Sequence, residues 1–177
     1  MEIGVISVRY ARALLKGATD AHIEDAVYRD MQTLAASFAA VPQLMQTLVA
    51  PMLSKDSKLA LLTTASGETP AKLTVSFLGI VLDNGREDIV QFMANSYITL
   101  YRKQKNIIRG RLTTAAAVHP ATERKMRSMV ESKTNGTVEF ETEVNPDIIG
   151  GFILEYDTYR MDASVRNRLN TILTALR

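Results

Sequence analysis

The chain has 177 residues, of which 46% are hydrophobic and 23% are charged, the composition of a globular protein large enough to bury a core. Its 21 basic and 19 acidic residues give a net charge of +2 and are spread over both halves, which argues against a polycationic nucleic-acid surface. The absence of cysteine excludes disulfides, thiolate nucleophiles and cysteine-ligated metals. We expect neither a membrane span nor a signal peptide, because there is no apolar run of about 20 residues and no basic segment leading into an apolar one.

Residues up to about 105 show the periodicity of helices, with apolar side chains recurring at steps of three and four. A first helix is predicted over 5–16. A second amphipathic helix is predicted after Asp20, which we expect to be its N-cap. Two short helices are predicted next, one opened by Pro42 and one capped by Ser54.

A fifth predicted helix, over 71–83, is apolar almost all round, which indicates burial on more than one face. We expect Thr69 and Pro70 to cap and open it, and Asn84-Gly85 to end it. A sixth helix is predicted from Glu87 to Lys105. These six helices, joined by short links, predict a compact N-terminal bundle.

After Ile107 the apolar period changes from helical spacing to two, which is typical of strands with one wet face. His119-Pro120 is expected to open a helix, and Asn135-Gly136 to form a turn. The remaining elements are three strands and a final helix, over 107–118, 138–144, 148–156 and 165–176. The predicted fold class is therefore α+β: a six-helix bundle over residues 1–105, followed by a smaller α/β domain over residues 106–177.

The sequence offers little for catalysis. His22 and His119 are isolated from each other and fit surface positions better than metal ligands. Serine-nucleophile motifs and a Walker lysine are absent. Gly150-Gly151 lacks a third glycine at nucleotide-binding spacing, and within a strand the pair predicts a bulge or a close backbone approach. We therefore predict no catalytic residue, cofactor or metal site.

Charged residues line the predicted strands. Glu139, Glu141 and Glu143 share one strand face, which fits a solvated face or, alternatively, an acidic contact surface for a basic partner helix. Arg109 and Arg111 also share a face, but no aromatic residues alternate with them. A nucleic-acid-binding two-domain α+β protein, or an enzyme, remains an alternative. Nucleic-acid binding would be marked by a basic stripe, which the sequence lacks, and an enzyme by a cluster of titratable groups, which it also lacks.

Motifs spread along the chain resemble those of the delta subunits of F-type ATP synthases, the family of the mitochondrial oligomycin-sensitivity-conferring protein. Tyr10-Ala11-Arg12-Ala13-Leu14 is similar to the family's opening motif. Pro42 with Leu44, then Pro51 and the 55–58 segment, resemble its middle part. Phe77-Leu78 followed by Asn84-Gly85-Arg86 resembles its buried helix and the turn after it.

The most specific resemblance lies in the second half. Spaced apolar residues lead from Val138-Glu139-Phe140 through Val144 and Ile148 to Gly150-Gly151-Phe152-Ile153, as in the family signature. The segment from Asp162 to Leu169, Asp-Ala-Ser-Val-Arg-Asn-Arg-Leu, is similar to the family's closing motif. The order and spacing of these motifs extend the resemblance over nearly the whole chain.

The resemblance implies a subunit without an active site or cofactor, which supports ATP synthesis coupled to proton transport. In the family, the N-terminal bundle binds the helical N-terminus of an alpha subunit in the catalytic head, and the C-terminal domain binds the b-type stalk. Together they resist the torque of the rotor. The protein would then lie at the cytoplasmic face of the cell (inner) membrane, attached through the complex, without inserting into the membrane or binding nucleic acid.

The resemblance also implies a binding groove for the alpha N-terminal helix between the first and fifth helices. Its residues here would be Tyr10, Ala13, Leu14, Ser76, Gly79, Ile80 and Asp83. Ala13, Ser76 and Gly79 are small and would let a partner helix approach closely. For Leu14 and Ile80 the pattern fits bundle core and groove equally well.

Overall fold

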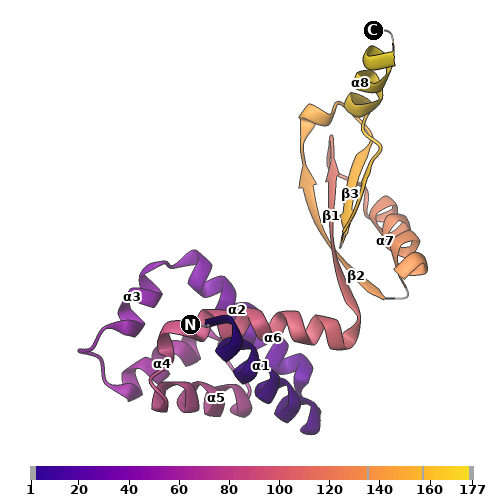
Figure 1. The fold of residues 1–177 in the computed structure, drawn as a ribbon. Helices are drawn as coiled ribbons and strands as arrows, with labels where there is room; N and C mark the ends of the chain where they lie inside the picture. Colours follow the sequence, from indigo (N-terminus) through magenta and orange to yellow (C-terminus); the bar gives the residue numbers. More distant parts are fainter. Residues whose placement is uncertain (1–2, 135, 157, 176–177) are drawn as a thin grey trace. The chain divides into compact units, whose positions relative to one another are not determined.

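The structure is a computed structural model that describes residues 3–134, 136–156 and 158–175. These residues form eight α-helices and one four-stranded sheet, which confirms the predicted α+β class (Figure 1). Contacts between residues divide the chain into two compact units, Met1–Lys103 and Gln104–Arg177.

The first unit is helical. Its elements are α1 (Ile3–Asp20), α2 (Glu24–Ala40), α3 (Gln43–Val49), α4 (Lys55–Ala65), α5 (Lys72–Asp83), the 3-10 turn η1 (Glu87–Ile89) and α6 (Val90–Lys105). The amphipathic patterns of these helices meet in one core, because their apolar faces need partners to leave water. The largest fully buried side chains there are Met31, Leu34, Leu48, Leu62, Leu78, Met93 and Tyr97.

Helix caps show where local sequence reasoning succeeds and fails. Ser54 is a cap as predicted, because its hydroxyl accepts a hydrogen bond from the Ser57 amide at 3.2 Å. Asp20 instead ends α1, and α2 begins after Ile23 without a side-chain cap, so that prediction was wrong. The predicted cap at Thr69-Pro70 was also wrong, because α5 begins two residues later, at Lys72.

The start of α5 is capped by a residue from another helix. The Ala71 amide donates to Asp30 Oδ2 on α2 at 2.9 Å, and the buried Thr74 hydroxyl donates to the same oxygen at 2.6 Å. Asp30 therefore satisfies an orphan amide at the helix start, the role that a local cap usually has. This contact fixes α5, one wall of the candidate site, against α2.

The second unit is built around a sheet with strand order β2-β1-β3-β4. Its elements are β1 (Ile107–Thr114), α7 (Pro120–Thr134), β2 (Thr137–Val144), the 3-10 turn η2 (Pro146–Ile148), β3 (Phe152–Tyr156), β4 (Tyr159–Asp162) and α8 (Val165–Ala175). Strands β1 and β2 are parallel with α7 as their crossover, whereas β3 and β4 add as antiparallel strands. Helix α7 lies along one face of the sheet (Figure 1). Its residue Val130 packs with Leu112, Val138 and Leu154.

The strands differ from prediction at their ends. β1 stops at Thr114 rather than residue 118, where the Thr114 hydroxyl donates to Ala116 O at 2.8 Å. β3 starts at Phe152 rather than Ile148, because η2 occupies the residues before Gly150-Gly151. The four-residue strand β4 was not predicted. The predicted turn at Asn135-Gly136 falls partly on residue 135, which lies outside the described residues.

Gly151 explains the glycine pair. It has φ +76°, and a Cβ there would overlap the Ala163 carbonyl oxygen. The predicted close backbone approach is therefore confirmed, although it precedes β3 rather than interrupting it.

Candidate partner-binding site

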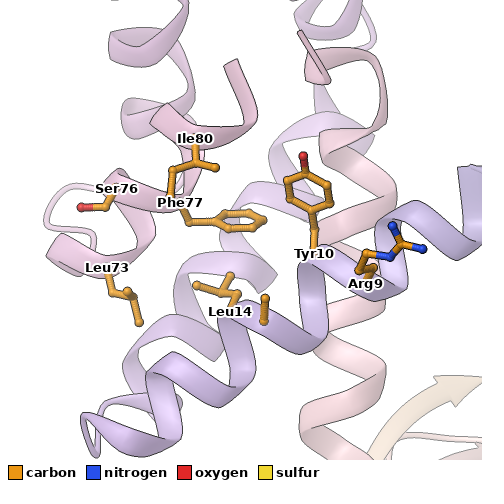
Figure 2. A pocket seen from close by; sticks show the side chains of 8 residues that line it. Arg9, Tyr10, Leu14, Leu73, Ser76, Phe77 and Ile80 are labelled. Atoms are coloured by element: carbon orange, nitrogen blue, oxygen red, sulfur yellow. The ribbon is translucent and has the colours of Figure 1, made fainter. Parts of the chain in front are cut away.

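A hollow of about 490 Å³ opens between α1 and α5. Four residues of each helix line it: Arg9, Tyr10, Ala13 and Leu14 of α1, with Leu73, Ser76, Phe77 and Ile80 of α5 (Figure 2). The α5 residues follow the i, i+3, i+4, i+7 spacing that places side chains on one helix face. The hollow is thus formed by one face of each helix, and most of its lining is apolar.

The floor of the hollow is part of the core. Leu14 is only 4% exposed, and Phe77 is also buried. The Tyr10 ring contacts the Phe77 ring edge to face, with centroids 6.4 Å apart and ring planes at 69°, a favourable aromatic arrangement (Figure 2). These contacts join the two walls and hold them at a fixed separation.

The walls above this floor are open. Ile80 is 54% exposed although it is a large apolar residue in the middle of a helix. Ala13 and Ser76 are exposed as well, and their small side chains leave room for an approaching backbone. Exposed apolar and small side chains above a buried apolar floor are typical of a surface that receives a partner's side chains.

The structure brings together five of the seven residues predicted for the groove: Tyr10, Ala13, Leu14, Ser76 and Ile80. Gly79 is not in the lining, and a Cβ at Gly79 would meet nothing within 4 Å, so its small size serves no close contact within the chain. Asp83 lies outside the lining too; it is exposed and pairs with Lys55 at 3.2 Å.

Sequence reasoning missed three lining residues, Arg9, Leu73 and Phe77. The signal for two of them was present, because Leu73, Phe77 and Ile80 recur at i, i+4 and i+7 along α5. Large apolar residues in a nearly all-apolar helix were interpreted as core. Phe77 is core on one side and groove floor on the other.

Basic residues border the hollow on the α1 side. Arg9 lines it, and Arg12 and Lys16 follow at helical spacing along the exposed side of α1. These three also line a neighbouring hollow along α1 that shares Arg9 and Ala13 with the first. Within the described span of α1 the only acidic residue is Asp20, at its end, so this border is cationic.

The lining of the hollow contains no carboxylate, imidazole or thiol, and its side-chain hydroxyls are those of Tyr10 and Ser76. Across the described residues no three His, Cys, Asp or Glu side chains are grouped as metal ligands, and His22 and His119 are both exposed as predicted. None of the described helices is both long and apolar enough to cross a membrane.

The second unit carries a different kind of surface. No residue of α8 is buried, and its apolar residues Leu169, Ile172 and Leu173 are 47 to 63% exposed. On the sheet, Glu141 and Glu143 are exposed, and Glu141 pairs with Arg109 at 3.3 Å, which fits the predicted solvated face.

Comparison with known proteins identifies the family. Residues 6–176 match the profile of the family described as "ATP synthase delta (OSCP) subunit". The chain is 46% identical to "ATP synthase subunit delta" of Phocaeicola vulgatus, over 97% of this chain and 94% of that protein. It is 43% identical to the protein of the same description from Parabacteroides distasonis, over 99% and 98% of the two chains.

A solved structure shares the fold. The chain matches one chain of the cryo-EM structure of the Toxoplasma gondii mitochondrial ATP synthase hexamer with a TM-score of 0.68, covering 97% of each chain at 21% identity. Both the profile match and the identity to the bacterial relatives extend over almost the whole sequence. The chain therefore belongs to the ATP synthase delta (OSCP) subunit family.

Proposed function

We propose that this chain is a non-catalytic stator subunit of a rotary, proton-translocating ATP synthase, linking the alpha subunits of the catalytic head to the b-type peripheral stalk. The relatives named above are delta subunits of that enzyme. The part that binds the head is the six-helix bundle of residues 1–105, and the part that binds the stalk is the α/β domain of residues 106–177. The division of the chain into two compact units supports these two roles.

The observation that carries this function is the apolar hollow between α1 and α5. An amphipathic helix binds such a groove through apolar residues at i, i+3, i+4 and i+7. The buried floor at Leu14 and Phe77 gives the groove a fixed shape, and the exposed Ile80 provides apolar area that a partner covers. The partner is the N-terminal helix of an alpha subunit.

The exposed apolar residues of α8 support stalk binding by the second unit. A stator must hold two partners at once without reacting with either, so two separate binding surfaces suit it. The protein is held at the cytoplasmic face of the inner membrane through these partners. The alternative of nucleic-acid binding is not favoured, because the net charge is only +2 and Arg109 is already paired with Glu141.

The test is recovery of a tagged full-length chain from detergent-solubilised membranes of its own host. We expect the alpha and b-type chains of the ATP synthase to be recovered with it. The variant Ala13→Asp places a carboxylate on the exposed wall of the groove and should release alpha while b-type chains stay bound, because the apolar face of a partner helix would have to remove water from that charge. Recovery of neither chain with the unmodified protein would falsify the proposed function.

A further inference from the structure

Helix α8 presents an apolar stripe that nothing in the described chain covers. No residue from Val165 to Ala175 is buried, and Leu169, Ile172 and Leu173 are all about half exposed or more. Together with Val165 they recur at steps of three and four, so they form one stripe along the helix. An isolated helix of this length is marginal in water, and a partner covering the stripe would stabilise it.

The only charged residues of the described helix stand on the borders of this stripe. At about 100° per residue, Arg166 falls on one side of the row formed by Val165, Leu169 and Ile172, and Arg168 falls on the other. The opposite face holds Asn and Thr residues. Both arginines are exposed, and neither has an ion-pair partner within the described part of the chain.

Helix stability does not account for these arginines. They stand in the first turn of α8, where the helix dipole favours negative charge and disfavours cations. The negative group at this end is Asp162, whose carboxylate accepts hydrogen bonds from the Ser164 amide at 3.0 Å and the Ser164 hydroxyl at 2.6 Å. The Ser164 hydroxyl in turn caps α8 by accepting from the Asn167 amide at 3.1 Å.

A further hydrogen bond fixes Val165, the first residue of the apolar stripe. The Val165 amide donates to Gly150 O at 2.9 Å, and Ser164 is almost fully buried. The residue before Gly150 is Ile149, which is exposed and has φ +69°, a costly backbone conformation for a β-branched residue. Ile149 is thus an exposed apolar residue immediately before Gly150, whose carbonyl oxygen holds the first turn of α8.

We propose that α8 binds lengthwise to an amphipathic helix of the b-type stalk whose apolar face is bordered by carboxylates on both sides. Arg166 and Arg168 would each pair with one border, and the apolar rows would cover each other. Matched charges on the rims of an apolar contact select the partner and its orientation. The partner's identity rests on the proposed function; its charge pattern rests on α8.

The test uses the full-length chain, with its α1–α5 groove saturated by an alpha N-terminal peptide, and two synthetic helical peptides as probes. The peptides share one leucine stripe and differ only in the flanking positions, which are all Glu in one and all Lys in the other. We expect the Glu peptide to bind at least tenfold more tightly at low salt, and this preference to shrink as salt is added. The double variant R166E/R168E should reverse the preference, and R166Q/R168Q should abolish it.

The control is Arg124→Glu, which reverses an exposed arginine on α7 and should leave the preference unchanged. Equal binding of both peptides, or a preference that survives R166E/R168E, would overturn the inference. So would a dimer of the chain in sedimentation that these variants dissociate, because the stripe would then be covered by a second copy.

The same variants separate this inference from the function on which it rests. If membrane-derived b-type chains bind R166E/R168E as well as the original chain, the charge pattern is wrong while the stator role stands. If the Glu peptide binds as expected but no b-type chain is recovered with the unmodified protein, the stator role fails and the chemistry of α8 stands.

Discussion

Replacing Ile80 with alanine separates binding from stability in the α1–α5 groove. Fully burying an isoleucine side chain contributes about 1.5–3 kcal/mol. Ile80 is 54% exposed, so a partner helix that covers it would gain about half of that, roughly 0.8–1.5 kcal/mol. Ile80→Ala should therefore weaken binding of an alpha N-terminal peptide about four- to twelvefold, since 1.4 kcal/mol is a factor of ten.

The same substitution should leave the fold nearly unchanged. Just under half of the Ile80 side chain is covered in the free chain, so its removal should cost about 0.7–1.4 kcal/mol in unfolding, partly offset by the higher helix propensity of alanine, which is a shift in Tm of less than about 8 °C for a unit of this size. Leu14→Ala is the opposite case, because Leu14 is buried and its loss should destabilise by about 2–5 kcal/mol. Leu14 and Ile80, which the sequence could not separate into core and groove, are thereby distinguished.

The assay is titration calorimetry with the alpha peptide, combined with thermal melts of the same samples. Phe92→Ala is the matched control, since Phe92 is half exposed on α6 and does not line the hollow. Peptide affinity within twofold of the original in a folded Ile80→Ala protein would refute the groove. An equal loss in Phe92→Ala would show that exposed apolar area, and not this hollow, determines binding.

Three further changes test the framework of the two units. Asp30→Ala removes the cap of α5 and should lower the free energy of unfolding in urea by about 2 kcal/mol; an unchanged midpoint would refute the cap. The Lys58 ammonium donates a hydrogen bond to the Glu87 carboxylate at 2.7 Å and holds the pKa of Glu87 below its ordinary 4.5. The pair therefore stabilises the folded chain above pH 4.5, and this stabilisation is lost as the pH falls through the lowered pKa of Glu87. Glu87→Gln should therefore flatten the acid side of the stability–pH curve, and an unaltered curve would contradict the pairing. Gly151→Ala forces a Cβ onto the Ala163 carbonyl and should cost more than about 1 kcal/mol, which a melt equal to that of the original chain would exclude.

The sequence predicted structure best where the cause is local. Ser54 caps α4 through an amide three residues away, and that pattern is visible in four letters of sequence. The cap of α5 comes from Asp30, 41 residues earlier than Ala71, and no local pattern contains it. Thr69-Pro70 had the right composition for a helix start, but a tertiary acceptor decided where the helix begins.

Most residues of the candidate site were named before the structure, but how deeply each side chain is buried was not. The resemblance to the delta subunits, and not periodicity alone, placed Tyr10, Leu14 and Ile80 in one groove, and the structure brings these three residues together in one hollow. Periodicity does not tell how far each side chain reaches into the core. The resemblance implied Gly79 as a groove residue and its small size favoured that role, yet Gly79 does not line the hollow.

Short strands are also hard to predict from the sequence. β4 is only four residues long, too short for an alternating pattern to be distinguished from a loop. The glycine pair was correctly predicted to mark a close backbone approach, but its place before β3 depends on η2, whose 3-10 turn has no periodic signal. Tertiary packing, rather than propensity, sets these boundaries.

The two proposed surfaces should act independently, because each is built from residues of a single compact unit. Energies of substitutions that share no contact usually add within about 0.5 kcal/mol. Combining Ile80→Ala with R166E/R168E should therefore weaken alpha-peptide binding no more than Ile80→Ala alone, and weaken stalk binding no more than R166E/R168E alone. Titrations of all four proteins with each partner measure both effects. A coupling above about 1 kcal/mol would mean that a change at one surface alters binding at the other, and the chain would then be able to transmit a conformational signal between its partners rather than only hold them.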